Sequence, residues 1–381
     1  MMGRMPWLEG AFGLDKLSYI HRRHGKLVFY FLLLHPTLLL VGNSISYQLS
    51  LSATLAVLLA LEYVVYAVIG LILFITVIIS SIRISRSKLR YEYWYFVHLM
   101  VYVAIFFAFR HQFELGEDLE ASSVFYAYWA ALYIIIFSSH IFFRWIRPLA
   151  RYFKHRFYVE RVHRETHEAT SIYISGKNME QFHIQPGQFM LFRFLRHGWW
   201  WQQHPFSLSM APNGKEIRIT PKVLGDFTKE IQHITPGTKV YIDGPYGVFT
   251  DYPESAEKML LIAGGIGITP VRALIERFMK RGKDVVLLYG NKKTEDIVFK
   301  HELEEFRKKG LRVTYIISDE PSFTGEKGYI DAEKIGRLVS DFKEREVFLC
   351  GPPAMMDSVL VSLEKLGISK NSIFFERFEL G

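Results

Sequence analysis

The sequence YWYFVHLMVYVAIFFAF, residues 93–109, is apolar or aromatic except for His98, and Arg110 and His111 follow it directly. Its length approaches the roughly 20 residues that a helix needs to cross a bilayer. Comparable segments cover residues 26–47, 55–82 and 124–146. The alternative, four buried helices of a soluble bundle, is disfavoured because runs such as LVFYFLLL offer no polar face to water. We therefore predict a four-span membrane domain.

The charges between these segments predict how they cross the membrane. Arginine and lysine gather before the first segment, between the second and third, and after the fourth, whereas the other two connections are neutral or acidic. Because cytoplasmic loops carry the excess of Lys and Arg, both termini are predicted to be cytoplasmic. The expected location is the plasma membrane.

Ionisable residues inside a membrane are costly and are functional by default. His21 and His35 are separated by about 21 Å of helix, and His98 and His111 by about 19.5 Å. Both segments are predicted to run from inside to outside, so the first histidines share one level and the second histidines another. The spacing predicts two bis-histidine haem sites stacked across the bilayer.

One geometric difficulty concerns the third segment. Thirteen residues of ideal helix leave the rings of His98 and His111 about 140° apart. We therefore expect a π-bulge there, or a loosened helix end at His111. His24 matches the partner segment less well than His21, and His140 lies on a segment that runs the other way. Both are expected to be hydrogen-bonded structural histidines.

Composition excludes several classes of protein. The chain of 381 residues is 50% hydrophobic, which excludes disorder, and its net charge of +8 suits either nucleic acid or the cytoplasmic face of a membrane protein. No nucleic-acid partner is expected. The single cysteine, Cys350, excludes an internal disulfide and a zinc or iron–sulfur cage. Since no CxxCH motif is present, any haem is held non-covalently.

The residues after about 153 have the pattern of two soluble domains. RFYVERVHRE and ATSIYIS alternate like strands and are followed by turn signals, which predicts a small antiparallel β-barrel. Later, the strands KMLLIAGG and DVVLLYG alternate with the helices VRALIERFMKRG and HELEEFRKKG, which predicts a parallel α/β domain. The predicted domains are residues 1–150, 151–254 and 255–381.

Three motifs in this half are suited to nucleotide cofactors. AGGIGITP (Ala263–Pro270) joins a strand to a helix, so its glycines suit a pyrophosphate, although they also suit close strand–helix packing. The turn Gly225–Thr228 can hold phosphate through backbone N–H groups. HPFSLS (His204–Ser209) combines an aromatic face with hydroxyls that suit a flavin ring, but an ordinary barrel strand also alternates in this way.

In their order along the chain, HPFSLS, GDFT, GPYG, GGIGITP, CGPPAMM and the terminal ERF resemble the ferredoxin–NADP reductase-like module. Joined to LSYIHRRHG, LHP, YWYFVHL and FRH, the chain resembles the NADPH oxidase and ferric reductase superfamily over nearly its whole length. The closest likeness is to prokaryotic NADPH oxidase homologues such as the streptococcal one. The resemblance implies FAD, two b-type haems and NADPH as cofactors, with NADH tolerated.

The resemblance also implies roles for individual residues. Phe206 is expected to flank the isoalloxazine, Ser207 to reach its N5 region, and His204 to lie near the flavin phosphates. The residues expected to bind FAD are His204, Pro205, Phe206, Ser207, Ser209, Gly225, Asp226, Phe227 and Thr228. Gly244 of GPYG is also expected to bind a cofactor. The haem ligands that it implies are His21, His35, His98 and His111, the same four that the spacing selects.

For the nicotinamide half, the resemblance places Cys350 beside the nicotinamide and Phe378 as an aromatic shield over the flavin. The residues expected to bind NAD(P)H or to close this site are Gly264, Gly265, Gly267, Thr269, Pro270, Cys350, Gly351, Glu376 and Phe378. Phe378, Cys350 and Ser207 are the predicted catalytic residues. Lys292 and Lys293 are expected either to meet the 2′-phosphate of NADPH or to be a solvated charge pair.

The predicted function is a transmembrane NAD(P)H oxidase that passes electrons through FAD and two haems to extracytoplasmic oxygen, with superoxide as the product. One alternative is a ferric-chelate reductase, and another is a membrane electron carrier to a dedicated protein partner. A third is a non-redox protein with structural histidines. Arg110 is expected to meet a haem propionate, draw an anion outward, or serve as an interfacial anchor. No cytosolic activator is expected, and eukaryotic relatives usually carry six spans where four are visible here.

Overall fold

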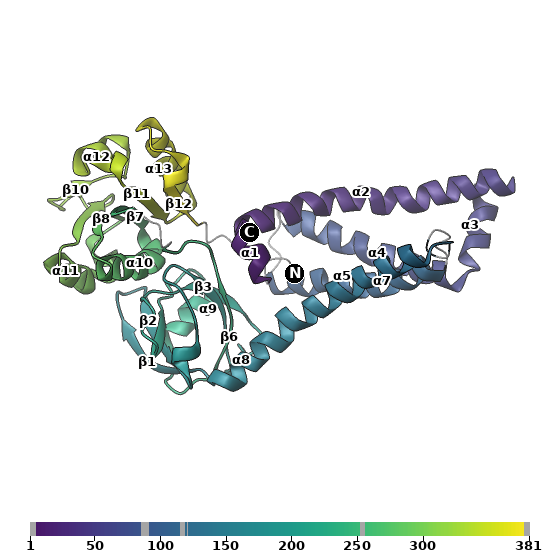
Figure 1. Cartoon of the computed structure of the whole chain (residues 1–381), viewed down its shortest axis with the longest axis horizontal. Coiled ribbons are helices and arrows are strands. Elements are labelled where there is room, and N and C mark those ends of the chain that lie inside the picture. Colours follow the sequence, from purple (N-terminus) through teal and green to yellow (C-terminus); the bar gives the residue numbers. More distant parts are fainter. Residues whose placement is uncertain (1–4, 85–90, 115–118, 120, 252–255, 377–381) are drawn as a thin grey trace. The chain divides into compact units, whose positions relative to one another are not determined.

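The computed structural model describes residues 5–84, 91–114, 119, 121–251 and 256–376, and it divides into two compact units (Figure 1). One unit is Ser18–Ser139, and the other is His140–Gly381 together with Met1–Leu17. The described residues of the first unit fold only into helices and their connections. The strands of the described residues all lie in the second unit.

Long apolar helices form the first unit. The helices that precede the first strand are α1 (Pro6–Phe12), α2 (Leu14–Tyr47), α3 (Leu51–Leu59), α4 (Glu62–Ile84), α5 (Tyr91–Glu114) and α7 (Ser123–Ile141), followed by the π-helical turn η2 (Phe142–Ile146) and α8 (Arg147–His155). Of these, α1, η2 and α8 belong to the second unit. Four stretches are long and apolar enough to cross a bilayer: Lys16–Tyr47, Glu62–Ile82, Tyr93–Glu114 and Ser123–His155. The prediction of four spans is confirmed.

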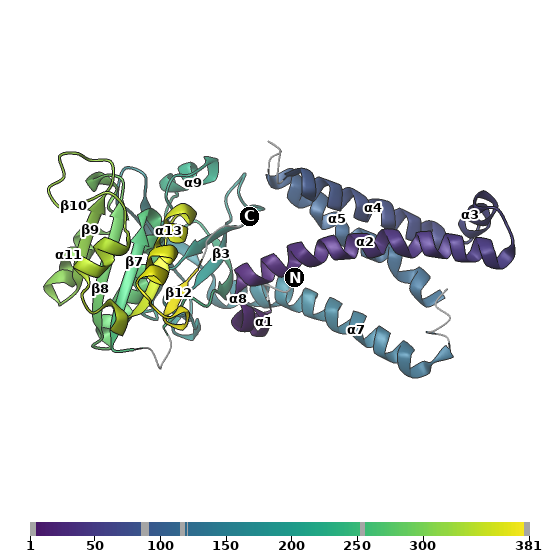
Figure 2. The same cartoon turned by 90° about the horizontal axis from the view of Figure 1, so that it is seen from above.

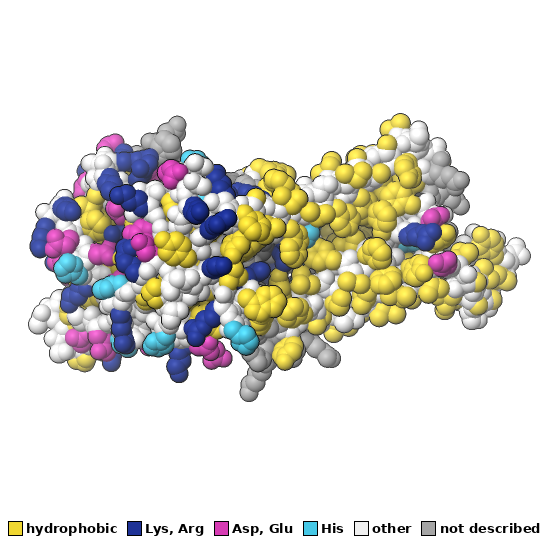
Figure 3. Space-filling model, turned by 90° about the horizontal axis from the view of Figure 1, so that it is seen from below, with side chains coloured by type: hydrophobic (Ala, Val, Ile, Leu, Met, Phe, Trp, Pro, Cys, Tyr) yellow, Lys and Arg dark blue, Asp and Glu magenta, His cyan; other side chains and the backbone are white. Residues whose placement is uncertain are grey.

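Apolar side chains on these helices face outward. At most 11% of any of the four apolar windows is buried. On the face seen in Figure 3, hydrophobic side chains cover the helical part almost continuously, whereas charged side chains are spread over the sheet-containing part. A surface of this kind is stable against lipid tails and unstable against water.

Small residues bring α4 and α5 close together. A Cβ atom added to Gly70 would lie 2.9 Å from the carbonyl oxygen of Ala104 and 3.3 Å from the Cβ of Ala108. Ala104 itself is completely buried. This is the small-residue contact by which helices pack in membranes, where no hydrophobic effect drives them together.

The segment predicted as one span over residues 55–82 is two helices, so that prediction is wrong in its length. The helix α3 begins after Ser50, whose hydroxyl accepts the N–H of Ala53 at 3.3 Å, and it ends before Ala60. The helix α4 starts anew at Glu62. No glycine or proline lies at the break, and nothing in the local sequence explains it.

Two alternatives were predicted for the third segment, a π-bulge or a loosened helix end at His111, and neither is found in residues 91–114. The helix α5 is regular from Tyr91 to Glu114, and His111 lies within its last turn. A π-helical turn does occur in the fourth segment, at Phe142–Ile146, just before Pro148. Because proline cannot donate the hydrogen bond of a regular turn, a widened turn beside it has a direct cause.

The six strands that follow pair into two antiparallel three-stranded sheets and form the predicted barrel. The orders are β1-β2-β5 and β4-β3-β6. The strands are β1 (Tyr158–Arg164), β2 (Thr170–Ser175), β3 (Phe189–Phe194), β4 (His204–Ser207), β5 (Glu216–Ile219) and β6 (Val240–Tyr246), with the short helix α9 (Asp226–Glu230) between β5 and β6. Alternate residues of these strands, such as Ile172, Ile174, Phe192 and Phe194, fill one core.

A parallel six-stranded sheet of order β10-β9-β8-β7-β11-β12 forms the rest of the second unit. Its strands are β7 (Lys258–Gly264), β8 (Asp284–Asn291), β9 (Arg312–Ile317), β10 (Glu326–Lys327), β11 (Glu346–Cys350) and β12 (Ile373–Phe375). Its helices are α10 (Ile268–Lys280), α11 (Lys300–Lys308), α12 (Ala332–Leu338) and α13 (Pro353–Lys365). Shorter 3₁₀ turns are η3 (Met179–Gln181), η4 (Ile231–His233), η5 (Gly265–Gly267), η6 (Thr294–Asp296), η7 (Phe342–Glu344) and η8 (Lys370–Ser372).

Helices cover both faces of this sheet, as the continuous apolar strands require. Met259 and Leu261 of β7 belong to one buried cluster, together with Leu274 of α10. Leu260 and Ile262, which point to the opposite face, belong to another cluster. The predicted strand–helix alternation is confirmed, and it places the carboxyl ends of β7 and β11 side by side.

Arg345 holds the opposite end of the sheet together. Its buried guanidinium donates to both carboxylate oxygens of Asp341, to Asp284, and to the carbonyl oxygen of Met259. Hydrogen bonds from Arg345 hold the pKa of the Asp341 carboxyl far below its usual range, despite partial burial. We expect Arg345→Met to destabilise the domain by about 3–5 kcal/mol, because it leaves two carboxylates without their buried partner.

Thermal unfolding of the detergent-solubilised full chain measures this effect. Arg312→Met is the matched control, because Arg312 pairs with the same Asp284 but its side chain is 55% exposed. Its loss should cost no more than about 1 kcal/mol. Equal shifts in melting temperature for the two variants would contradict the assignment.

Candidate functional site

Two pairs of histidines link α2 to α5 in the helical unit. The ring centroids of His21 and His98 are 6.1 Å apart, and those of His35 and His111 are 6.4 Å apart. The structure therefore brings together the four histidines predicted as ligands, in the predicted pairing. Thirteen residues of regular helix leave His98 and His111 about 140° apart around α5, yet each ring lies beside its partner on α2, so no bulge is needed.

The spacing of each pair fits a metal ion between the rings. Two imidazoles on opposite sides of one metal ion, each with a metal–nitrogen bond of about 2 Å, have centroids roughly 6 Å apart. Both pairs have this separation. Neutral imidazole is also the usual non-covalent protein ligand of haem iron. The donor set thus fits two bis-histidine haem sites.

Ser81 and Trp94 surround His98, and both were missed by the sequence analysis. The hydroxyl of Ser81 donates to the carbonyl oxygen of Val77 at 2.7 Å and lies 3.3 Å from Nδ1 of His98. The indole N–H of Trp94 also donates to this hydroxyl, at 3.3 Å. With its proton already donated, the hydroxyl can only accept from Nδ1–H, which leaves Nε2 of His98 for a metal.

The other polar residues predicted in the spans have ordinary surroundings. Nδ1 of His24 lies 2.9 Å from the carbonyl oxygen of Ile20, as expected for a structural histidine. The guanidinium of Arg110 stacks on Tyr63 at 4.7 Å and lies 3.5 Å from the carboxylate of Glu114. These contacts agree with the interfacial-anchor interpretation of Arg110.

The residues predicted to bind flavin meet on one side of the barrel. The rings of His204 on β4 and Phe227 on α9 are stacked at 3.5 Å, and Phe206 lies 6.4 Å from Phe227. Thr228 Oγ1 accepts the N–H of Gly225 at 2.9 Å, so this hydroxyl stabilises the turn itself. The structure thus joins the HPFS strand to the GDFT turn, with open space beside Gly225.

The two serines of the HPFSLS motif differ in accessibility. Ser207 is partly exposed at the end of β4. Ser209 is completely buried, and its hydroxyl is hydrogen-bonded to Thr220 at 2.8 Å and accepts Nε of Arg218 at 3.1 Å. Ser207 is therefore the one of the two whose surroundings leave access for a ligand.

The motifs predicted to bind NAD(P)H meet where β7 and β11 end. A Cβ atom on Gly267 would lie 2.5 Å from the carbonyl oxygen of Cys350, and one on Gly264 would lie 2.1 Å from Sδ of Met355. These two glycines are required by close packing. Gly265 has a φ of +50° and nothing within 4 Å of its Cβ position, so it combines a left-handed backbone with open space.

The remaining predicted residues of this half lie around the same point or outside it. Gly247, the last glycine of GPYG, leaves room for the buried carboxylate of Glu376, which a Cβ would approach to 3.0 Å. Thr269 and Pro270 are buried at the start of α10. Lys292 and Lys293 are exposed, and Nζ of Lys293 lies 3.4 Å from Glu295. Phe378 lies outside the described residues.

Cys350 has the surroundings of an unreactive thiol. Its side chain is 1% exposed, and burial, together with the nearby carboxylate of Glu376, raises the pKa of the thiol far above its usual range. Since only the thiolate is nucleophilic, we expect no alkylation of the native protein by iodoacetamide at pH 8 over hours. Unfolding in guanidinium should release one reactive thiol per chain. Stoichiometric labelling of the native protein would contradict the buried placement.

Family comparisons agree with this arrangement. Residues 1–109 match the ferric reductase like transmembrane component, residues 157–250 an FAD-binding domain, and residues 261–360 an oxidoreductase NAD-binding domain. The chain is therefore a membrane oxidoreductase that uses NAD(P)H. With these three domains in this order, it has the architecture of the NADPH oxidase and ferric reductase-like superfamily.

Individual relatives match only part of the chain. It is 28% identical to sulfhydrogenase 2 subunit gamma of Pyrococcus furiosus, over 53% of this chain and 74% of that protein. It is 31% identical to NADH-cytochrome b5 reductase 1 of Dictyostelium discoideum, over 39% of this chain and 55% of that protein. The FAD/NAD-binding domain of nitric oxide dioxygenase from Vibrio cholerae shares the fold, with a TM-score of 0.52 at 24% identity, covering 59% of this chain and 99% of that domain. The closer likeness to the streptococcal homologue stays a prediction.

Proposed function

We propose that this protein carries electrons from cytoplasmic NAD(P)H through FAD and two haems to oxygen on the other side of the plasma membrane, forming superoxide. The observation that carries the proposal is the two histidine pairs on the membrane-spanning helices, 6.1 and 6.4 Å between centroids, in a chain that also has FAD- and NAD-binding domains. The orientation is inferred from the basic connections. The proposed domain limits are 1–150, 151–254 and 255–381.

Each group of residues has a proposed task. Gly264–Pro270 would receive the NAD(P)H pyrophosphate, with Lys292 and Lys293 near the adenosine end. Cys350 and Gly351 would form the wall beside the nicotinamide. Phe206, Ser207 and the turn Gly225–Thr228 would hold FAD. Bound FAD supplies the conversion of a two-electron hydride into single electrons, and haem iron supplies one-electron carriers inside the bilayer.

The overall reaction balances as NAD(P)H + 2 O₂ → NAD(P)⁺ + H⁺ + 2 O₂⁻. Two histidine levels are needed because a single carrier cannot bridge a hydrocarbon core of about 30 Å. Ser81 would orient His98 by occupying its Nδ1. Terminal Phe378 and Glu376 would close the flavin face until nicotinamide displaces the aromatic ring.

A comparison of two acceptors in one preparation tests the proposal. With NADPH and air alone, the purified chain should consume oxygen and reduce cytochrome c in a manner that superoxide dismutase suppresses. Anaerobic reduction of ferric citrate should be several-fold slower. Faster reduction of ferric citrate would make the protein a ferric-chelate reductase, and no turnover in air would favour a carrier that needs a protein partner. A purified protein without a Soret band would overturn the haem assignment.

A further inference from the structure

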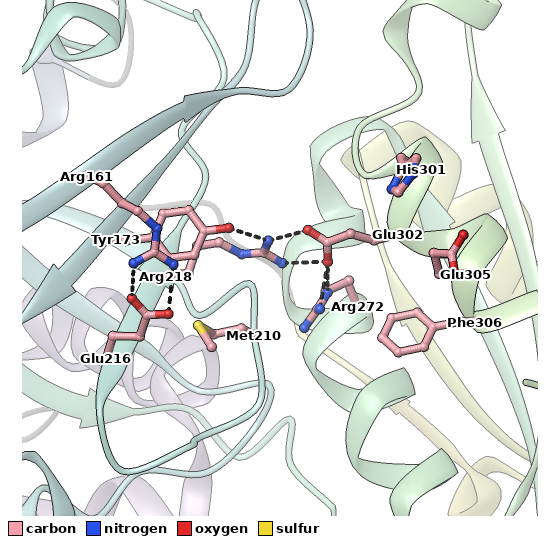
Figure 4. A pocket seen from close by; sticks show the side chains of 10 residues that line it. All are labelled: Arg161, Tyr173, Met210, Glu216, Arg218, Arg272, His301, Glu302, Glu305 and Phe306. Carbon is pink, nitrogen blue, oxygen red and sulfur yellow. Dashed lines mark hydrogen bonds and ion pairs between the residues drawn. The ribbon is translucent and has the colours of Figure 1, made fainter.

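A pocket of about 380 Å³ lies between the barrel and the α/β domain, within one compact unit (Figure 4). Arg161, Tyr173, Glu216 and Arg218 line it from the barrel, and Arg272, His301, Glu302 and Phe306 from the α/β domain. The two domains are joined here by charged side chains. Arg218 reaches from β5 to Glu302 on α11, as the dashed lines show.

Arg218 is the centre of this junction. Its side chain is 2% exposed. It donates from Nη1 to Glu302 Oε1 at 2.5 Å and from Nη2 to Glu302 Oε2 at 3.2 Å. On the barrel side, Nη2 donates to the carbonyl oxygen of Ser209 at 2.6 Å and Nε to its hydroxyl at 3.1 Å. A fully paired guanidinium of this kind has one preferred geometry, because its donors are held in a rigid fork.

The carboxylate of Glu302 is shared with a second arginine. Nε of Arg272 donates to Glu302 Oε2 at 2.7 Å, and the same guanidinium pairs with Glu276. Glu276 makes a second link between the α/β domain and the barrel, because its Oε2 accepts the N–H of Ala211 at 3.2 Å. Burial opposes ionisation of Glu302, but hydrogen bonds from Arg218 and the charge of Arg272 hold the pKa of its carboxyl below the usual range. The network is therefore charged at neutral pH.

The network of ion pairs reaches residues next to both proposed cofactor sites, one in the barrel and one in the α/β domain. Ser209 accepts two hydrogen bonds from Arg218. It lies two residues after Ser207, the last residue of the proposed flavin strand β4. Arg272 lies on α10, one turn after Thr269 and the glycine loop. A rigid connection therefore runs from the proposed flavin strand to the proposed nicotinamide loop.

We propose that Arg218, Glu302, Arg272 and Glu276 form a clamp that fixes the α/β domain on the barrel, and so sets the distance for hydride transfer from NAD(P)H to FAD. These are positioning residues, because the hydrogen bonds described for their side chains run to one another and to Tyr173, Ser209, Ala211 and Lys280. A displacement of about 1 Å between reacting groups can slow a reaction by about 100-fold. The clamp thus acts on the rate of flavin reduction and leaves nucleotide affinity unchanged. It rests on the proposed placement of the two cofactors.

Anaerobic stopped-flow reduction of the FAD-loaded full chain by NADPH tests the clamp. Glu302→Gln removes the shared charge and turns an amide N–H₂ toward two arginines. We expect the limiting rate of flavin reduction to fall at least tenfold, the absorbance of the NADPH–flavin charge-transfer complex to weaken, and the NADPH dissociation constant to change less than threefold. Glu302→Asp, which keeps the charge but withdraws the carboxylate by one methylene, should also slow reduction and guards against a misfolded glutamine variant.

Glu216→Gln is the matched control. Glu216 lines the same pocket and forms an ion pair with Arg161, but both residues belong to barrel strands. Its loss should leave the reduction rate within twofold. The clamp is overturned if the Glu302 variants melt earlier yet reduce bound FAD at the normal rate, since that result describes a purely structural pair. Failure of NADPH to reduce the unaltered protein would instead refute the proposed function.

Discussion

Replacing His98 with alanine is expected to abolish transmembrane electron transfer while flavin reduction survives. His98 faces His21 with 6.1 Å between ring centroids, and its Nδ1 is held by Ser81. Without this imidazole, one proposed haem would lose one of its two histidine ligands. Reduction of the proposed extracytoplasmic acceptor should fall at least 100-fold, because the one site that remains cannot bridge a hydrocarbon core of about 30 Å alone.

The reduced-minus-oxidised absorption spectrum of the purified variant measures haem content. It should fall to about half that of the unaltered protein, and NADPH should not reduce the haem that remains. Reduction of a soluble dye by NADPH at the flavin should stay within twofold. His35→Ala is expected to lose the same absorbance but to leave a haem that NADPH still reduces, because the proposed inner pair is intact.

His24→Ala is the control for this experiment. His24 lies three residues from His21 on the same helix, but its Nδ1 is hydrogen-bonded to the carbonyl oxygen of Ile20. It should retain both haems and full transfer. An unchanged spectrum in the His98 variant, or an undiminished rate to the outer acceptor, would refute the proposed path.

The position of each histidine along its helix, and so its pairing partner, could be predicted from the sequence. The side chains that surround the histidines could not. Helix rise is fixed, so residue spacing places His21 with His98 and His35 with His111 before any contact is known. Angles around the helix axis predicted a bulge in α5 that does not exist, because the way in which α2 crosses α5 is a tertiary property. Ser81 reaches His98 from α4, and no spacing within α5 reveals that contact.

The same division holds in the second unit. The strand β7 and the helix α10 could be predicted from the pattern of their apolar residues and from the glycines between them. Arg218 lies in the strand sequence EIRI, where an alternating polar residue ordinarily faces solvent. It is buried because Glu302, 84 residues away, supplies the opposite charge from another domain. An ion pair between residues so far apart in the sequence depends on how the two domains pack together, which the local sequence does not reveal.

Replacing Gly267 with alanine is expected to disrupt the NAD(P)H site. The φ of Gly267 is −60°, a value that alanine adopts without backbone strain. The obstacle is contact, because its Cβ would lie 2.5 Å from the carbonyl oxygen of Cys350 and 2.7 Å from Cα of Gly351. Both are backbone atoms, which cannot rotate away as a side chain can. The ends of β7 and β11 must therefore separate.

This separation should raise the NADPH dissociation constant at least tenfold and destabilise the domain by about 1–3 kcal/mol, the usual cost of overpacking. Equilibrium titration and thermal unfolding of the full chain measure the two effects. Gly264→Ala is expected to be milder, because its closest contact at 2.1 Å is Sδ of Met355, near the end of a flexible side chain. Its other close contact, Cδ of Pro352 at 2.9 Å, is looser than the backbone contacts of Gly267. Gly336→Ala on α12, with nothing nearer than 3.8 Å, should leave affinity unchanged. The steric argument requires the loss of NADPH affinity to be largest for Gly267→Ala, smaller for Gly264→Ala and absent for Gly336→Ala. Equal losses at Gly336 and Gly267 would refute it.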